Sequence, residues 1–348
     1  MRVLITGGNG YIGSHTVLSL ADAGYDLVVL DDFSNSKPRT FDVLKSMVDN
    51  RVMLAFIKGD VRNSGLVEQL INYYAIKSVV HFAAVKSVSE SMADPLKYFN
   101  INVCGLASLL SAMQATETKN LVFSSSCTVY GDSSHLPLKE CSPRNSINPY
   151  GLSKIMCEEM LETLCSKSTG WHVTSLRYFN PIGAHPSGCI FDDPLSKSPS
   201  VIPSLLRVVS GHEPFFGIFG SDYNTADGTA VRDYIHVVDL ANSHVAALNR
   251  YSDLTTDRNT HPIRSEFCPI NVGLGEGVSV LELIHYFESA ASVSIPTKIL
   301  PRRTGDAGTV FCDNTKVKEI LPEWKPKFTV SDACFHAYQA SRKNGNNY

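Results

Sequence analysis

Three glycines spaced by three follow the first apolar stretch of the chain, in TGGNGYIG. Apolar periodicity predicts a buried strand over residues 2–5, a tight turn over 6–13 and a helix over 11–23. A second buried strand is expected over residues 27–30. In such a strand–turn–helix–strand unit, the helix N-terminus can receive a phosphate group. The opening of the chain therefore predicts a nucleotide-binding unit.

Each glycine of the turn has its own predicted role. Gly7, Gly10 and Gly13 stand where the turn must be tight, where backbone must approach a pyrophosphate, and where helix must pack on strand. Asp31 ends the second strand, where its carboxylate can accept hydrogen bonds from an adenosine ribose and would repel a 2′-phosphate. An ordinary glycine turn is the alternative, but the two strands, the helix and Asp31 follow one another at the spacing of a nucleotide-binding unit. The stretch therefore predicts NAD, rather than NADP, as cofactor.

The same alternation of strands and helices continues to about residue 180. The expected strands and helices are residues 52–57, 66–74, 78–84, 106–115 and 120–126. Repeated units of this kind build a Rossmann-type, doubly wound parallel sheet with helices on both faces. Ligands of such sheets bind at the carboxyl ends of the strands. Residues 60–61, 82–86 and 124–126 are therefore predicted to line one crevice.

The pattern becomes irregular after residue 180, where Pro and Gly cluster through residues 180–203. We predict a Rossmann domain over residues 1–180 and a smaller, mixed α/β domain over 181–348 that closes over the crevice. Further expected elements are helices over residues 237–250 and 278–291, and strands over 173–180 and 267–273 that return to the main sheet.

Composition narrows the class of protein. The chain carries 31 Lys and Arg against 34 Asp and Glu, a net charge of -3 without a basic block, which disfavours a nucleic-acid partner. Its apolar runs are shorter than the roughly eighteen residues of a membrane span, and its first residues are typical of a core strand rather than a signal peptide. The nine scattered cysteines suggest neither a metal site nor a disulfide framework. We therefore expect a cytoplasmic protein without metal or membrane contact.

Tyr150 and Lys154 form the sharpest chemical pattern, four residues apart in NPYGLSK. On a helix they lie on one face, and an ammonium near a phenol should lower the phenol pKa from about 10 toward the range of a general base. Ser126, at a strand end, could hydrogen-bond the same substrate hydroxyl, and Lys86 would also favour the phenolate. Such Tyr–Lys pairs arise by chance on many helices. Combined with a dinucleotide fold and Ser126, the pair predicts a catalytic site.

Longer motifs carry a resemblance that is more specific than the glycine turn. They are TGGNGYIGSHTV, HFAAVKSVSESMADPLKY, LVFSSSCTVYGD, NPYGLSK, LRYFNPIGAHPSG, IFGSDYNTADGTAVRDYIHVVDLA and PRRTGD. On these motifs, which run nearly end to end, the chain resembles the extended short-chain dehydrogenase/reductases and, within them, the UDP-glucose 4-epimerase family. The resemblance implies reversible inversion at C4 of a UDP-hexose with NAD held throughout, through a 4-keto sugar that rotates and is reduced on its other face.

The resemblance also implies residue roles. Tyr150, with Ser126 and Lys154, forms the catalytic set. Implied cofactor contacts are Gly7, Gly10, Tyr11, Ile12, Gly13, Asp31, Asn35, Asp60, Val61, Phe82, Lys86, Asn102, Lys154 and Tyr178. Implied substrate contacts are Lys86, Ser126, Tyr150, Asn180, Ser200, Val201, Phe219, Arg232, Arg303, Asp306 and Val310. Arg232 and Arg303 match diphosphate contacts, for which guanidinium is well suited, although surface ion pairs with nearby acids are the alternative for both.

Some positions depart from the family pattern. Ala84 replaces a common Gly, Leu152 replaces a basic residue, and Ser200 replaces an Asn that contacts the sugar nucleotide, which leaves that contact open. Val310 falls on the position where a bulky Tyr restricts the sugar pocket. Because valine is small, we expect UDP-N-acetylhexosamines to be accepted as well.

The sequence disfavours two other functions and is compatible with one assembly. A 4,6-dehydratase or decarboxylase needs an acid directly after the catalytic Ser, where this chain has Cys127 and Thr128. An NAD-sensing regulator has no need for the catalytic set. The resemblance implies a homodimer formed by helices over residues 106–115 and 155–164, unless their apolar faces simply cover the sheet.

Overall fold

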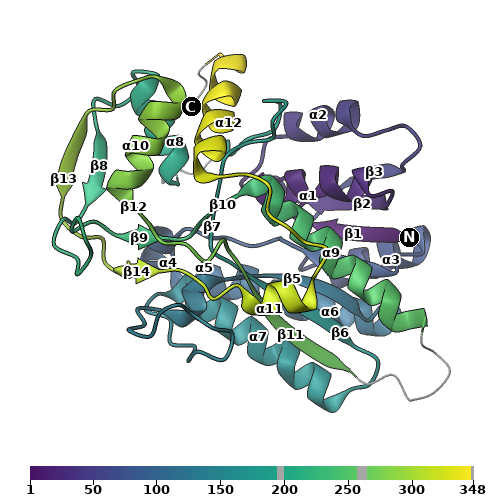
Figure 1. The fold of residues 1–348 in the computed structure, drawn as a ribbon. Helices are drawn as coiled ribbons and strands as arrows, with labels where there is room; N and C mark the ends of the chain where they lie inside the picture. Colours follow the sequence, from purple (N-terminus) through teal and green to yellow (C-terminus); the bar gives the residue numbers. More distant parts are fainter. Residues whose placement is uncertain (194–199, 257–264, 346–348) are drawn as a thin grey trace.

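A computed structural model describes residues 1–193, 200–256 and 265–345. Its largest unit is a seven-stranded parallel sheet in the order β11-β6-β5-β4-β1-β2-β3 (Figure 1). These strands are β1 (Arg2–Thr6), β2 (Asp26–Asp31), β3 (Leu54–Lys58), β4 (Ser78–His81), β5 (Asn120–Ser126), β6 (His172–Tyr178) and β11 (Glu266–Val272). The predicted Rossmann-type sheet is confirmed, including the return of β6 and β11. Its strand order reverses between β1 and β4, which is where ligands bind in such folds.

Helices cover both faces of this sheet. One face carries α1 (Tyr11–Asp22), α2 (Arg39–Met47) and α9 (Val237–Thr256), and the other carries α3 (Ser64–Tyr74), α6 (Gly105–Ala115) and α7 (Pro149–Lys167). Along β1, Val3 and Ile5 join the first core and Leu4 joins the second, because successive residues of a strand point to opposite faces. Burial on both faces explains why these strands are almost continuously apolar.

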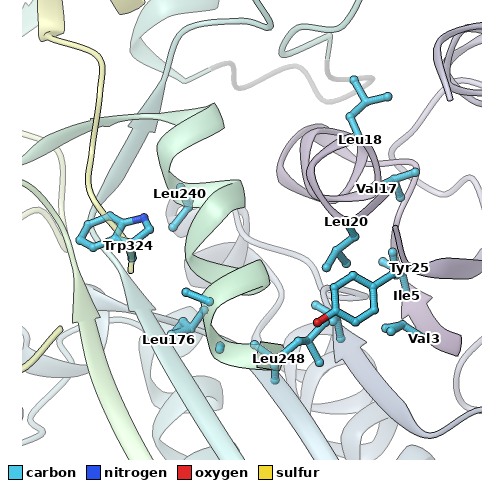
Figure 2. Packing of buried hydrophobic residues seen from close by; sticks show 14 of the residues in the cluster. Val3, Ile5, Val17, Leu18, Leu20, Tyr25, Leu176, Leu240, Leu248 and Trp324 are labelled. Carbon is cyan, nitrogen blue, oxygen red and sulfur yellow. The ribbon is translucent and has the colours of Figure 1, made fainter. Parts of the chain in front are cut away.

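The contact between α1 and α9 joins the start of the chain to its middle. Figure 2 shows Leu20 of α1 and Leu248 of α9 in one cluster with the sheet residue Leu176. At the edge of this cluster, the Tyr25 hydroxyl donates to Asn249 Oδ1 at 2.5 Å. Because α9 packs on the sheet and β11 pairs with β6, both belong with the sheet. The division of the chain at residue 180 stays a prediction.

A second group of elements lies beside the sheet, at the upper left of Figure 1. Its strands are β7 (Asn180–Ile182), β8 (Phe216–Phe219), β9 (Val231–Arg232), β10 (Tyr234–His236), β12 (Val278–Ser279), β13 (Thr297–Leu300) and β14 (Thr309–Val310). Its helices are α8 (Val201–Val209), α10 (Val280–Ala291) and α12 (Val330–Lys343), which share a third core, and α11 (Thr315–Ile320) packs near β11. The irregular stretch over residues 180–203 includes residues 194–199, and the predicted second domain also includes residues 257–264 and 346–348. These three segments lie outside the described residues.

Shorter elements complete the described chain. They are α4 (Val88–Ala93), α5 (Pro95–Tyr98), a π-helix (Phe99–Cys104) and a 3₁₀ turn (Cys127–Tyr130). The strand expected over residues 78–84 ends earlier, at His81, because the Phe82 and Ala83 amides both donate to the Thr6 carbonyl. Among the described residues, no helix is both long and apolar enough to cross a membrane.

A buried ion pair fastens α7 to the sheet. Arg177 of β6 and Glu158 of α7 are 2% and 0% exposed, and their side chains form two hydrogen bonds of 2.9 and 2.6 Å. The hydroxyls of Ser125 and Ser175 also donate to Glu158. Burial raises the pKa of Glu158, but the hydrogen bonds and charge of Arg177, together with the hydrogen bonds from Ser125 and Ser175, outweigh it and hold that pKa below its usual range. The pair is therefore fully charged and fully bonded.

Removing one partner of this pair should be strongly destabilising. In Arg177→Met, Arg144 at the longer distance of 3.3 Å would be the cation left to the buried Glu158, and we expect the free energy of unfolding to fall by about 3–5 kcal/mol in urea denaturation. Arg207→Met breaks an exposed pair with Glu213 instead and should lower it by less than about 1 kcal/mol. Similar small losses in both variants would contradict a structural role for the buried pair.

Candidate active site

The glycine turn brings α1 into close contact with β1. Gly7 has a φ of 71°, a backbone region that favours glycine, and a Cβ there would lie 2.6 Å from the Ala83 nitrogen. A Cβ on Gly13 would lie 2.4 Å from the Gly7 carbonyl oxygen. Gly10, in contrast, lines an open cleft. Among the described residues no side chain caps the N-terminus of α1, so this helix end is suited to a phosphate group.

Asp31 lies at the end of β2 and organises the loop that follows. Its Oδ2 accepts the Asn9 amide at 2.9 Å, and its Oδ1 accepts the Phe33 amide and the Ser36 hydroxyl at 3.0 and 2.9 Å. Burial raises the pKa of Asp31, and these hydrogen bonds oppose the rise. Asn9, which the sequence interpretation missed, also donates from Nδ2 to the Lys37 carbonyl at 2.8 Å. The only signal for Asn9 was a polar residue between two glycines of the turn.

One cleft extends from the glycine turn along the carboxyl ends of β1, β4 and β5. Its lining includes most of the predicted cofactor contacts, namely Gly7, Gly10, Tyr11, Ile12, Gly13, Asp31, Asn35, Asp60, Val61, Phe82, Lys86, Lys154 and Tyr178. Tyr150 lines the same cleft. Ser124, predicted to line the crevice, also lines it, whereas sequence reasoning missed further lining residues, which include Asn9, Ser36, Lys37, Asp192 and Asp193.

Asn102 is positioned behind the cleft rather than in its lining. Its Oδ1 accepts the Val85 amide at 2.9 Å, and its Nδ2 donates to the Val85 carbonyl and the Ser153 hydroxyl at 3.1 and 2.9 Å. These bonds hold the segment after β4, which carries Lys86, against α7. The structure thus gives Asn102 a supporting position, and its direct contact with a cofactor stays a prediction.

The predicted catalytic side chains meet at the start of α7. Asn148 caps this helix, because its Oδ1 accepts the Gly151 amide at 2.9 Å, and so fixes the turn that carries Tyr150. Ser126, at the end of β5, lies beside Tyr150 and acts to lower the pKa of its phenol. One turn further, Lys154 Nζ donates to the Ser124 carbonyl at 2.7 Å. The structure therefore brings Ser126, Tyr150 and Lys154 to one place.

The pKa of Tyr150 differs from the sequence prediction. Burial raises it to about 12, although the hydrogen bond with Ser126 opposes the rise. Burial also lowers the pKa of Lys154 to about 8. The prediction that Lys154 lowers the phenol pKa is therefore wrong in the absence of other charges. Burial raises the pKa of Tyr150, and the Lys154 ammonium is directed to the Ser124 carbonyl. A general base at Tyr150 therefore needs additional positive charge in the cleft.

Predicted substrate residues form a second group, beside the start of α7. The Arg303 guanidinium lies 3.6 Å from the centre of the Phe219 ring, in a cation–π contact. Burial lowers the pKa of Arg303, and the charge of Asp306 opposes this shift. The loop that carries Arg303 and Asp306 reaches the start of α7, because Asn148 Nδ2 donates to the Gly305 carbonyl at 3.4 Å. The helix cap of α7 therefore connects the two groups.

Arg232 and Val310 are paired across β9 and β14. Arg232 donates to the carbonyls of Val231, Gly308 and Ala307 at 2.9, 3.1 and 2.7 Å, so it holds the loop that precedes β14. Val310 is 6% exposed and packs in the same cluster as Cys127, the neighbour of Ser126. Val310 therefore lies in the core beside the end of β5.

Asn180 and Ser200 have different surroundings. Asn180 begins β7, and its Oδ1 is buried without a hydrogen-bond partner among the described residues, which marks it as available to a ligand. The Ser200 hydroxyl donates to Asp192 Oδ2 at 2.6 Å. Val201 follows as the first residue of α8 and packs against the third core.

The chain is similar to known proteins over nearly its whole length. The model of the NAD dependent epimerase/dehydratase family matches residues 3–260. The UDP-glucose 4-epimerases of Dictyostelium discoideum and Homo sapiens are each 40% identical to this chain, cover 100% and 99% of it, and are each matched over 97% of their own length. The chain belongs to the UDP-glucose 4-epimerase family. A solved UDP-glucose 4-epimerase from Bifidobacterium longum, in complex with NAD+ and UDP, is 37% identical, covers 100% of both chains and has a TM-score of 0.92.

The residues after Ser126 fit an epimerase better than a dehydratase. Cys127 is buried, and burial raises the pKa of its thiol to about 12, so it stays protonated. Thr128 donates from its hydroxyl to Ser126 Oγ at 2.9 Å. Both residues support the strand end, and neither supplies the carboxylate that elimination or decarboxylation requires.

A methyl group added to Gly13 should disturb the nucleotide site. Because the new Cβ would overlap the Gly7 carbonyl, we expect Gly13→Ala to lower the free energy of unfolding by about 1–3 kcal/mol and to weaken NADH binding, measured by fluorescence titration. Gly65→Ala in α3 is the matched control, since its Cβ meets only Asn63 Oδ1 at 3.6 Å. That variant should stay within about 1 kcal/mol of the parent and bind NADH normally. Normal NADH binding by Gly13→Ala would contradict the assigned packing.

Proposed function

We propose that this chain interconverts UDP-galactose and UDP-glucose reversibly, with NAD as its bound cofactor. The observation that carries the proposal is the convergence of Ser126, Tyr150 and Lys154 at one end of the dinucleotide cleft. Family membership supports the same reaction. The test is to follow UDP-galactose by proton NMR of the anomeric region with no added NAD, and conversion toward UDP-glucose is expected.

The cleft fits NAD on the protein's own features. A Cβ on Gly7 or Gly13 would collide with neighbouring backbone, so these glycines allow the close turn that presents the N-terminus of α1 to the cleft. This helix end suits the pyrophosphate, and Asp31 suits the adenosine ribose. When bound, NAD supplies a hydride acceptor for C4 and, in its oxidised form, the positive charge that the groups around Tyr150 lack. A 2′-phosphate would meet the carboxylate of Asp31, which favours NAD over NADP.

In this mechanism Tyr150 removes the proton of the 4-OH while the C4 hydrogen leaves as hydride. Ser126, beside Tyr150, orients the same hydroxyl, and Lys154 holds the end of β5 through the Ser124 carbonyl. The positive charge of the oxidised cofactor would stabilise the phenolate. The 4-keto sugar then rotates about its diphosphate link. Tyr150 would return its proton to the keto oxygen as C4 is reduced on its opposite face, which inverts C4. Each group recovers its original state.

Rotation requires a firm grip on UDP and a loose grip on the sugar. The proposed UDP grip consists of Asn180, Phe219, Arg232, Arg303 and Asp306. Guanidinium groups hold a diphosphate through paired hydrogen bonds, and the unpartnered Asn180 Oδ1 offers a further acceptor. The role of Ser200 is the weakest of the set, because its hydroxyl donates to Asp192.

Removal of the Tyr150 hydroxyl should abolish the proton transfer but not cofactor binding. We expect Tyr150→Phe to convert UDP-galactose about 10²- to 10⁴-fold more slowly than the parent. Its NADH fluorescence titration should be unchanged within a few-fold. Tyr73→Phe removes a hydroxyl from a side chain that is 81% exposed and should leave the NMR rate unaltered. If Tyr150→Phe converts UDP-galactose at the parent rate, Tyr150 is not the base.

The size of Val310 bears on which sugars are accepted. The side chain packs between the sheet end and the Arg232 strand, in one cluster with Cys127 and Ala307. A larger residue there would extend toward the sugar end of the site. We therefore propose that UDP-N-acetylhexosamines are also substrates.

A tyrosine at position 310 should separate the two substrates. For Val310→Tyr we expect the rate with UDP-N-acetylgalactosamine to fall about tenfold or more relative to the rate with UDP-galactose. Parallel NMR assays of both substrates on one preparation make UDP-galactose the internal control. Failure of the parent on both N-acetyl epimers, with rapid UDP-galactose turnover, would refute the proposed openness of the site.

A homodimer and a cytoplasmic location complete the proposal. The helix surfaces expected to pair are partly used elsewhere, since Leu106 and Leu109 of α6 are 0% exposed beneath the sheet. The apolar side chains that remain exposed on neighbouring α5 and α7 are Leu96, Leu152 and Met156, at 75%, 43% and 38%. We propose that a second copy covers this surface. The nine cysteines are all free thiols, which suits a reducing compartment.

Charges on this surface should prevent the pairing. In the double variant Leu96→Glu and Leu152→Glu, we expect light scattering after size exclusion to give the mass of one chain, where the parent gives two. Ile299→Glu is the control, because Ile299 is 62% exposed on β13. It should keep the parent mass. A monomeric parent would refute the proposed dimer.

A further inference from the structure

One carboxylate joins two segments of the chain at the ribose end of the cleft. Asp193 Oδ1 accepts Lys37 Nζ at 2.5 Å, and its Oδ2 accepts Arg39 Nη2 at 2.5 Å. Lys37 and Asp193 both line the cleft. Lys37 and Arg39 follow β2, whereas Asp193 follows β7, so the contact connects the nucleotide layer to the second group of elements.

This contact is linked to the hydrogen bonds of Asp31, the residue predicted to bind the adenosine ribose. The Asn9 amide donates to Asp31, and Asn9 Nδ2 donates to the Lys37 carbonyl. Lys37 in turn reaches Asp193 through its ammonium. On the other side of the cleft, Asp192 is fixed because its Oδ2 accepts the Ser200 hydroxyl at the N-cap of α8. A path of polar contacts therefore connects Asp31 to Asp193.

We propose that Asp193, bonded to Lys37 and Arg39, is a clasp that retains the dinucleotide in the cleft. This inference rests on the proposed function in taking NAD as the occupant, and it assigns retention to a residue distant from the catalytic set. With the clasp formed, the adenosine end can leave only after Asp193 releases both cations.

The alternative is a pair of ordinary surface contacts, which contribute little. The Asp193 side chain is only 17% exposed, although Lys37 and Arg39 are 33% and 50% exposed. Each of its oxygens holds a separate cation, so both bonds must be broken before the two segments can separate. This geometry favours a closure over two independent surface pairs.

Retention matters for the proposed reaction. The same dinucleotide must return the hydride that it received, and its loss midway would leave a 4-keto sugar without a reductant. The exposed cations alone would not close the cleft, because Asp193 connects them to the segment after β7. The clasp therefore serves the step in which the sugar rotates.

The test measures release of NADH rather than turnover. Parent and Asp193→Asn are loaded with NADH, a large excess of ADP-ribose is added, and the loss of protein-bound fluorescence is followed. Asparagine keeps the side-chain shape and removes the charge, so we expect release to be at least about fivefold faster. Glu213→Gln weakens the exposed pair with Arg207 and should release NADH at the parent rate.

A double-mutant cycle distinguishes loss of the clasp from a general destabilisation of the cleft. In a Lys37→Met and Arg39→Met background, Asp193→Asn should add little further acceleration, because its partners are already gone. A parent-like release rate in Asp193→Asn, with normal NADH binding, overturns the clasp and leaves the proposed epimerase reaction intact. Failure of the parent to bind NADH overturns the clasp together with the cofactor assignment, whereas NADH binding without epimerisation affects only the proposed function.

Discussion

The close contact between α1 and the turn after β1 is the constraint on which the rest of the nucleotide side depends. Gly13 packs so tightly on the Gly7 carbonyl that no side chain fits between them. This contact directs the start of α1 at the carboxyl end of β1. Because parallel strands end at a common edge, Asp31, Lys86 and the end of β5 are then arranged around one cleft.

The helix α7 connects this cleft to the proposed substrate grip. Its cap, Asn148, orients the turn that carries Tyr150 and also donates to the Gly305 carbonyl in the substrate loop. Further along, Glu158 binds Arg177 inside the core and holds the whole helix against β6. A movement of the loop that carries Gly305 would therefore act on the turn that carries Tyr150, while the buried ion pair keeps the helix axis in place.

Much of the fold could be predicted because it depends on local patterns. The apolar strands, the glycine turn and the Tyr150–Lys154 spacing are all properties of short segments, and the sheet and cleft follow from them. The pKa of Tyr150 could not be predicted, because it depends on burial by segments far away in the sequence. Asp193 was missed for the same reason, since its partners Lys37 and Arg39 are distant in the sequence and its own surroundings resemble an ordinary loop.

The central claim is that one retained cofactor takes the C4 hydrogen and returns it to the same sugar. UDP-galactose carrying deuterium at C4 tests this claim when it is incubated in ordinary water with excess unlabelled NADH, and the UDP-glucose product is examined by NMR and mass spectrometry. The account predicts that the product retains its deuterium at C4. Replacement of that deuterium by hydrogen, from water or from free NADH, would contradict it.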